Sequence, residues 1–167
     1  RALSPGRLLA SAPDDAADVI QEAPLEERDG LLALLDEATR TEVIALLAYA
    51  EDAAGGLMNP RYARVRPEMR VNEAISYLRR QARERIETIY YVYVLNAQQQ
   101  LLGVVSFREL FAASGEQQVS TVMHTDVVAV SEQMDQEEVS QVFAQHDLIA
   151  LPVIDAAGRM KGIVTVD

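Results

Sequence analysis

The chain has 167 residues, of which 49% are hydrophobic and 25% charged, with no cysteine and a formal net charge of −11. A chain of this length can form one large domain or two small domains, each with a buried core. No apolar run approaches the length of about 18 residues that a membrane helix needs. The lack of cysteine excludes disulfides and thiolate metal sites. The acidic balance argues against a nucleic-acid partner, because binding relies on Lys and Arg that neutralise phosphates. Divalent cations or a basic partner surface fit better.

The charge is unevenly distributed along the chain. Residues 1–50 hold ten acids and four arginines (−6), residues 51–115 hold seven acids and nine arginines (+2), and residues 116–167 hold nine acids and two bases (−7). Two acidic blocks therefore flank a mildly basic one. The chain begins at Arg1 without a signal peptide, so we expect a piece of a longer protein.

Residues 7–52 have the pattern of short amphipathic helices. The first runs from Asp14 to about Ala23, with prolines on both sides as boundaries, and two more are predicted at Leu25–Leu35 and Thr39–Tyr49. The pair Gly55-Gly56 follows this helical array, and we expect a hinge there.

Two later segments share one strand–turn–strand pattern. The segment Leu148–Asp167 has a β-branched run, a turn with Gly158 suited to a positive φ, and a second apolar run. The segment Tyr90–Arg108 repeats it with a turn at Asn96–Gln100. Because Pro152 lacks an N–H, we expect it on an edge strand or at irregular pairing.

The similarity extends upstream and indicates an internal duplication. Predicted helices occupy Val71–Arg85, with Asn72 as its cap, and Gln136–Gln145. The first copy carries six extra residues around 81–87. Two copies of a β-α-β-β pattern are therefore predicted, matched at Met58/Met123, Val65/Val130, Met69/Met134, Glu73/Glu138 and Gly103/Gly162.

Each repeat resembles a CBS domain, a β-α-β-β-α module that often binds adenine nucleotides. In addition, the junction Tyr49–Met58 and the segments Asp135–Val139 and Gly162–Asp167 resemble parts of MgtE-type magnesium transporters, and the preceding helices resemble that family's cytosolic amino-terminal domain. The resemblance implies an α + α/β fold class, with a truncated helical domain at residues 1–55, a first CBS domain at 56–115 and a second, truncated one at 116–167. It also implies a place on the cytoplasmic face of the cell membrane, a homodimer through the CBS domains, and a transmembrane domain outside this chain.

One set of acids is a candidate magnesium site. Asp14 and Asp18 lie four residues apart on one helix face, where like charges cost stability unless a cation sits between them. Mg²⁺ takes carboxylate oxygens. The alternative is an exposed acidic helix start, which the helix dipole favours. The resemblance implies that the two share Mg²⁺ with acids of the second CBS domain, namely Asp135, Glu137, Asp147 and Asp167.

The resemblance also implies a nucleotide site. CBS motifs place a Ser or Thr three residues after a Gly and an Asp three further on, which corresponds to Ser106 and to Glu109, a longer acid than usual. Arg108 would face a phosphate, and Tyr91 and Leu148 would flank adenine. Leu148 departs from the pattern, since an aromatic residue would stack better. Alternatively, Tyr91 and Leu148 are strand residues packed in the core.

Nothing in the sequence indicates catalysis. His124 and His146 are isolated, and Gly55-Gly56 lacks the Lys and Ser/Thr of a phosphate-binding loop. We therefore expect no enzyme, but the cytosolic Mg²⁺-sensing region of a magnesium transporter, with Mg²⁺ and an adenine nucleotide such as ATP as its ligands. Two alternatives remain: a nucleotide-sensing CBS module in which the acids only solubilise, and a dimerisation module without a ligand.

Overall fold

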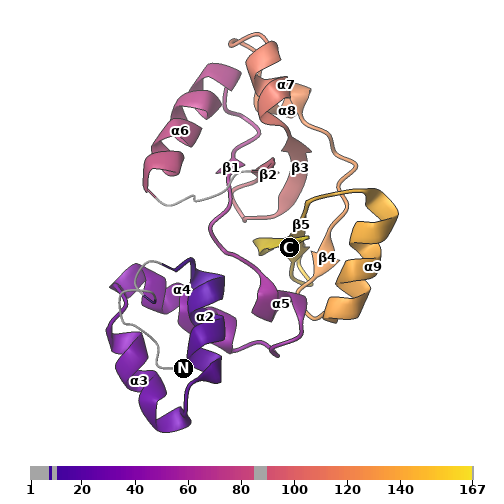
Figure 1. Cartoon of the computed structure of the whole chain (residues 1–167). Helices are drawn as coiled ribbons and strands as arrows, with labels where there is room; N and C mark the ends of the chain where they lie inside the picture. Colours follow the sequence, from indigo (N-terminus) through magenta and orange to yellow (C-terminus); the bar gives the residue numbers. More distant parts are fainter. Residues whose placement is uncertain (1–7, 9–10, 85–89, 167) are drawn as a thin grey trace.

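A computed structural model describes residues 8, 11–84 and 90–166, and shows a helical domain followed by two similar α/β units (Figure 1). The helical domain contains α2 (Pro13–Glu22), α3 (Leu25–Ala33) and α4 (Glu37–Leu47), and α5 (Ala54–Leu57) joins it to the rest. The first unit contains β1 (Arg64–Val65), α6 (Val71–Glu84), β2 (Val92–Leu95), β3 (Leu101–Val105) and α7 (Phe107–Ala112). The second contains α8 (Val119–Val122), β4 (Val130–Ser131), α9 (Gln136–His146), β5 (Ala150–Ile154) and β6 (Met160–Thr165).

The helical domain follows the predicted segments closely. Proline occupies the first position of α2, where its missing N–H would be unpaired in any case. Two arginines bind carbonyl groups near helix C-termini: the Arg28 guanidinium donates to the Gln21 carbonyl of α2 at 2.8 Å, and the Arg40 guanidinium donates to the Leu32 carbonyl of α3 at 3.0 Å. The small residues Ala16 and Ala17 are buried, which lets α2 and α4 pack closely.

The two α/β units confirm the internal duplication. Each has a three-stranded sheet in which the first strand pairs parallel to the second and the second pairs antiparallel to the third. The registers match, since Val65 pairs with Val94 and Val130 pairs with Val153. The hairpin turns also correspond: Gly158 has φ 81° and Gln99, at the same place in the first unit, has φ 66°.

The units exchange reciprocal contacts. A short helix precedes the first strand of each unit and contacts the other unit: the Ala54 N–H of α5 donates to the Met134 carbonyl at 2.8 Å, and the Val119 N–H of α8 donates to the Met69 carbonyl at 2.8 Å. The third strands need glycine at these contacts, because a Cβ on Gly103 would lie 2.8 Å from the Met123 sulfur and a Cβ on Gly162 would lie 2.8 Å from the Met58 Cγ. The pair is therefore a pseudo-twofold unit rather than two independent domains.

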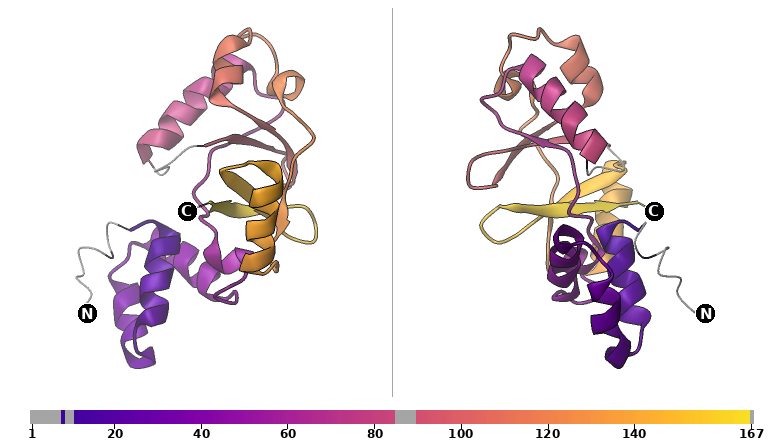
Figure 2. Two further views of the ribbon diagram at one scale, coloured as in Figure 1. Left: turned by 45° about the vertical axis from the view of Figure 1, so that its right-hand side comes forward. Right: turned by 90° about the vertical axis from the view of Figure 1, so that its left-hand side faces the viewer.

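The helical domain packs against the second unit (Figure 2). One buried cluster contains Ile20 and Leu46 of the helical domain together with Val139, Phe143 and Leu151 of the second unit. Between the units lies a smaller cluster of Tyr62, Tyr93, Leu95, Met160 and Ile163. Arg61, in the segment before β1, also contacts the helical domain: its guanidinium donates to the Thr39 hydroxyl at 2.8 Å and forms an ion pair with the Glu42 carboxylate at 3.1 Å.

Two local predictions are wrong, and a third is wrong in one of its two alternatives. Gly55 and Gly56 form no hinge, because they lie buried inside α5, where a Cβ on Gly56 would come within 2.3 Å of the Ala50 carbonyl oxygen. For Pro152 only the edge-strand alternative is wrong, because it lies on the central strand; its pairing is one-sided, since it pairs with Ile163 of β6 while the short strand β4 begins its pairing one residue later, at Val153. Asn72 is no cap, because α6 already begins at Val71.

Candidate functional site

The acids of α2 form a group of neighbouring negative charges that is partly buried. Asp14 is half-buried, and its Oδ1 is buried without a hydrogen-bond partner in the described chain. Burial, reinforced by the negative charges of Asp15 and Asp18, raises the pKa of Asp14 to about 6. Backbone hydrogen bonds at the helix start act in the opposite direction. Desolvation is the larger effect, so this carboxylate is destabilised as an anion.

Asp18 lies one turn further along the same helix, in a cleft of about 370 Å³ lined by Ser11, Asp15, Asp18, Val19 and Glu22. Its pKa is raised by partial burial first and then by the charges of Asp15, Glu22 and Glu51. Glu51 comes from the junction between the helical domain and α5. It belongs to the same electrostatic group but was missed from the sequence, because nothing in the local pattern shows that the chain returns to α2.

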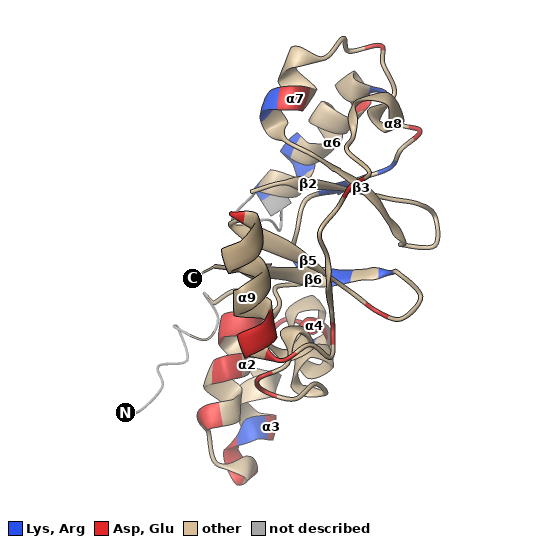
Figure 3. Cartoon of the chain, turned by 90° about the vertical axis from the view of Figure 1, so that its right-hand side faces the viewer, with Lys and Arg blue, Asp and Glu red and all other residues tan. Residues whose placement is uncertain are grey.

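The acids of the second unit lie at the two ends of α9. Asp135 caps the start of the helix, its Oδ1 accepting from the Glu137 N–H at 2.8 Å, while the Glu137 carboxylate is exposed. This end faces the junction, because Gln136 N–H donates to the Asp52 carbonyl at 2.9 Å. Figure 3 shows acidic residues gathered on α2 and α3 and at this end of α9.

Asp147 does not join that group. It ends α9 in the left-handed conformation, with φ 51°, and the helix rise of about 1.5 Å per residue places it about 15 Å from Glu137. Asp167 lies outside the described residues. Within residues 8, 11–84 and 90–166 no three Asp, Glu or His side chains converge closely enough to hold a metal ion. Which acids share Mg²⁺ therefore stays a prediction.

The predicted adenine-flanking residues do lie on one cavity. Tyr91, from the first unit, and Leu148, from the second, line a cavity of about 120 Å³ that also includes Tyr93, Val104, Asp126, Val127, Val128, Ala150 and Pro152. This volume is below the range of about 300–1,000 Å³ typical of whole small-molecule sites. Only part of a nucleotide would be enclosed here.

The other predicted nucleotide residues lie beyond the described lining of that cavity. Ser106 and Glu109 form a capping box at the start of α7: the Ser106 Oγ accepts from Glu109 N–H at 3.1 Å, and the Glu109 carboxylate accepts from Ser106 N–H at 3.0 Å. The Glu109 carboxylate also contacts His124, which is therefore not isolated. Arg108, which lies between Ser106 and Glu109 in the sequence, is exposed to solvent.

This architecture defines the class of the protein: a helical domain joined to a pair of reciprocally packed β-α-β-β units that carry acidic and basic surfaces. Residues 54–116 and 119–167 match the CBS domain family, and residues 10–52 match the MgtE intracellular N domain family. The chain belongs to the MgtE family of magnesium transporters, of which it represents the cytosolic part.

Individual proteins with similar sequences and structures support this family assignment. A magnesium transporter MgtE of Thermus thermophilus is 46% identical over 157 residues, which cover 92% of this chain and 35% of the transporter. The solved cytosolic domain of the Mg²⁺ channel MgtE in complex with ATP matches with a TM-score of 0.90 and 45% identity, over 99% of this chain and 69% of that one. The soluble part of a magnesium transporter matches with a TM-score of 0.91 and 31% identity, over 99% and 66%.

The chain spans about a third of the length of the curated transporters that it matches. The matches confirm the predicted fold class, the expectation of a cytosolic domain, and the expectation that the chain is not an enzyme. In the described part of the chain, each helix is too short or too polar to cross a bilayer.

Proposed function

We propose that this chain is the Mg²⁺-sensing region of a magnesium transporter, in which Mg²⁺ bridges acidic faces of the helical domain and the second CBS domain and thereby gates a pore outside this chain. The observation that carries the proposal is Asp14, a partly buried carboxylate whose Oδ1 has no partner in the described chain and whose neighbours are also acids. A hard divalent cation is the ligand that such oxygens lack.

The physical basis is mutual repulsion. At an effective dielectric constant of about 20, two unit charges about 6 Å apart repel by roughly 3 kcal/mol. Partial burial, followed by the negative charges of Asp15, Glu22 and Glu51, already destabilises the ionised carboxylate of Asp18 and raises its pKa. Mg²⁺ turns this repulsion into attraction, so it favours compact packing of the helical domain on the CBS pair, and low Mg²⁺ favours separation. A ligand shifts such an equilibrium only by its difference in affinity for the two states. In the full-length protein the compact state would hold the pore closed.

The ligands fall into groups. Asp14, Asp18 and Glu51 supply the helical-domain side, and Asp135 and Glu137, beside the junction, supply the CBS side. Asp147, at the far end of α9, would serve a separate ion, and Asp167 is the remaining candidate from the family resemblance. Several weak ions acting together would give a response in the millimolar range.

Thermal unfolding with MgCl₂ tests this function. We expect millimolar Mg²⁺ to raise the melting temperature by several degrees, since about 1 kcal/mol corresponds to about 2–4 °C at this size, and we expect Asp14→Asn/Asp18→Asn to lose most of that shift. NaCl of equal ionic strength should reproduce only the screening part. The control Glu26→Gln/Asp29→Asn removes two exposed acids of α3 and should respond like the parent. An equal shift in all three chains would contradict the proposal.

A second function, nucleotide binding, is supported by the cavity between Tyr91 and Leu148 and by the ATP complex of a similar cytosolic domain. The adenine ring would lie between the two side chains, with the phosphates outside near Arg108. Titration calorimetry with ATP should show binding that Tyr91→Ala weakens about tenfold or more, because losing stacking costs about 1–3 kcal/mol. ATP binding without any Mg²⁺ response would favour the nucleotide-sensor alternative, and a response to neither would favour a plain dimerisation module.

A further inference from the structure

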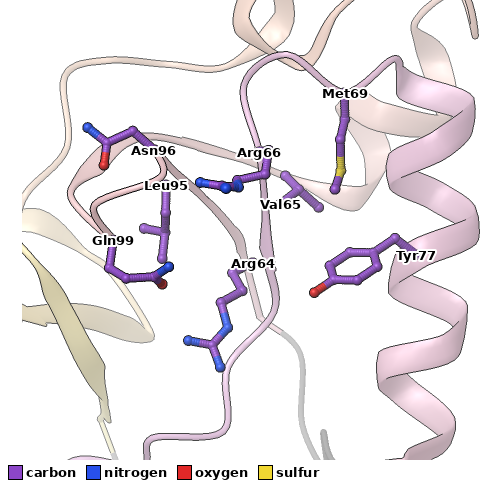
Figure 4. Close-up of a pocket in the computed structure, with 8 residues that line it drawn as sticks. All are labelled: Arg64, Val65, Arg66, Met69, Tyr77, Leu95, Asn96 and Gln99. Carbon is purple, nitrogen blue, oxygen red and sulfur yellow. The ribbon is translucent and has the colours of Figure 1, made fainter.

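A second, larger cleft opens on the first unit and plays no part in the functions above. It lies between β1, α6 and the turn of the β2–β3 hairpin, and it has a volume of about 440 Å³ (Figure 4), within the range of small-molecule sites. Among the described residues, its lining shares none with the cavity of Tyr91 and Leu148. The residues that matter here are Arg64, Arg66, Tyr77, Leu95, Asn96 and Gln99.

Two arginines give this cleft its charge. Arg64 and Arg66 are two residues apart on an extended segment, so they share one side of it, while Val65 between them is buried at 2% exposure. Arg66 is half-buried, and its Nη1 is buried without a hydrogen-bond partner. The Arg64 guanidinium reaches only the Tyr62 hydroxyl, at 3.3 Å, and the face of that ring. Across the described residues neither arginine forms an ion pair, and no acid lines the cleft.

The fold itself does not require these arginines, as the second unit demonstrates. Its positions equivalent to Arg64 and Arg66 are Ala129 and Ser131, and the equivalent of Asn96 is Asp155. The same strands and hairpin form there without a basic residue at the two positions equivalent to Arg64 and Arg66.

In the second unit, a side chain of the helical domain contacts the region that corresponds to this cleft. The Tyr49 hydroxyl of the helical domain donates to the Glu132 carboxylate there, at 2.6 Å. Burial raises the pKa of Tyr49 to about 12, with further contributions from the Glu132 hydrogen bond and the charges of Glu132 and Asp155. In the second unit, Tyr49 contacts this region, and its acid Asp155 is paired with Arg159 and Lys161. In the first unit, the two arginines of the open cleft form no ion pair with a described acid.

We propose that the open cleft binds the phosphate group of a small water-soluble molecule. The guanidinium groups of Arg64 and Arg66 donate to the phosphate oxygens, which supplies the acceptor that Arg66 Nη1 lacks. The ring of Tyr77 and the side chain of Leu95 form an apolar wall for the rest of the molecule, and the Gln99 amide at the rim offers a further donor. The planar fork of arginine suits phosphate better than a lysine ammonium does.

Titration calorimetry of the 167-residue chain with sodium pyrophosphate, without Mg²⁺ and at constant ionic strength, tests this site. Pyrophosphate has no adenine, so the outcome is independent of Tyr91 and Leu148. We expect binding by the parent, a loss of at least tenfold in affinity for Arg66→Gln, and an intermediate loss for Arg66→Lys, which keeps the charge but not the fork. The matched control Arg79→Gln removes the same charge from the exposed face of α6 and should bind like the parent.

Thermal unfolding shows whether Arg66→Gln folds, and Arg64→Gln, at a more exposed position, replaces it if it does not. Equal affinity in the parent, the cleft variant and Arg79→Gln would overturn the proposal, because any binding would then reflect overall charge. An absence of pyrophosphate binding would overturn it too. So would Arg66-dependent sedimentation with phosphatidylglycerol vesicles in the absence of pyrophosphate binding, because the site would then belong to a membrane surface.

Discussion

Two charged side chains bury an atom that has no hydrogen-bond partner in the described chain: Asp14 through Oδ1 and Arg66 through Nη1. Such a group costs free energy in the folded state, roughly 1–3 kcal/mol and more when charged. The two belong to different domains and have opposite charges, so they point to different ligands. A divalent cation would stabilise the first and an oxyanion the second. At both positions we therefore expect the bound ligand to raise the free energy of unfolding relative to the unliganded chain.

Asp14→Asn should stabilise the chain when Mg²⁺ is chelated. Burial raises the folded-state pKa of Asp14 from 3.8 to about 6, so the folded state binds the proton more tightly than the unfolded state does. The free energy of unfolding of the parent must then decrease as the pH rises through this interval. At neutral pH we expect the variant to be more stable by about 1–2 kcal/mol, a figure discounted for the partial exposure of the group. Near the unfolded-state pKa of about 4 the difference should vanish.

Urea unfolding across this pH range measures the effect. The control is Asp29→Asn on the exposed face of α3, which should keep the pH dependence of the parent. If Asp14→Asn also keeps it, burial of Asp14 is not what limits stability at neutral pH.

At the scale of elements, the short helix α5 is what joins the helical domain to the second unit. Its Ala54 and Gly55 N–H groups donate to the Met134 and Glu132 carbonyls, each at 2.8 Å. The Tyr49 ring lies so close that a Cβ on Gly55 would come within 2.4 Å of it. The close approach of backbone segments, rather than flexibility, explains the two consecutive glycines.

Gly56→Ala should therefore destabilise the chain. The added Cβ would lie 2.3 Å from the Ala50 carbonyl oxygen, a backbone atom that cannot move without distorting the junction. We expect a loss of about 1–3 kcal/mol, as for other overpacked sites, measured by urea unfolding. Gly30→Ala provides the matched control: no atom lies within 4 Å of its added Cβ in α3, so the substitution should stabilise by about 0.5–1 kcal/mol. Equal effects at the two positions would show that α5 packs loosely.

The elements also show what the sequence could predict. Periodicity and the Gly103/Gly162 correspondence were sufficient for the duplicated pattern, because turn and strand preferences act over a few residues. The role of Gly55-Gly56 was not accessible, because a glycine at a hinge and a glycine at a close contact look alike until the Tyr49 ring is placed. Glu51 was missed as a neighbour of Asp18 for the same reason: their proximity depends on how the chain folds back through the junction.

At the scale of the whole molecule, the two CBS units form one structural body. Backbone hydrogen bonds link Asn59 with Ile163 and Val104 with His124 in both directions, so neither unit completes its edge without the other. Among the described residues, the buried cluster of the helical domain includes residues of the second unit. Motion in response to Mg²⁺ is therefore expected at the contact between the helical domain and the second unit, where the acidic groups of α2 and α9 flank the junction, and not within the pair.

We expect the chain to form a homodimer through its CBS domains, and a substitution at Phe111 tests this expectation. This side chain is 63% exposed on α7 and stacks on Phe107 with ring centroids 6.2 Å apart, which makes it the largest exposed apolar side chain of the described CBS pair. Aromatic residues in such positions are typical of interface centres. We expect light scattering to show a dimer of the 18.4 kDa chain, and Phe111→Ser to weaken it at least tenfold. Leu25→Ser, at a side chain 76% exposed on the helical domain, should leave the dimer intact. A monomer in the parent at high concentration with Mg²⁺ present, or equal weakening by both substitutions, would show that the chain does not associate through this face.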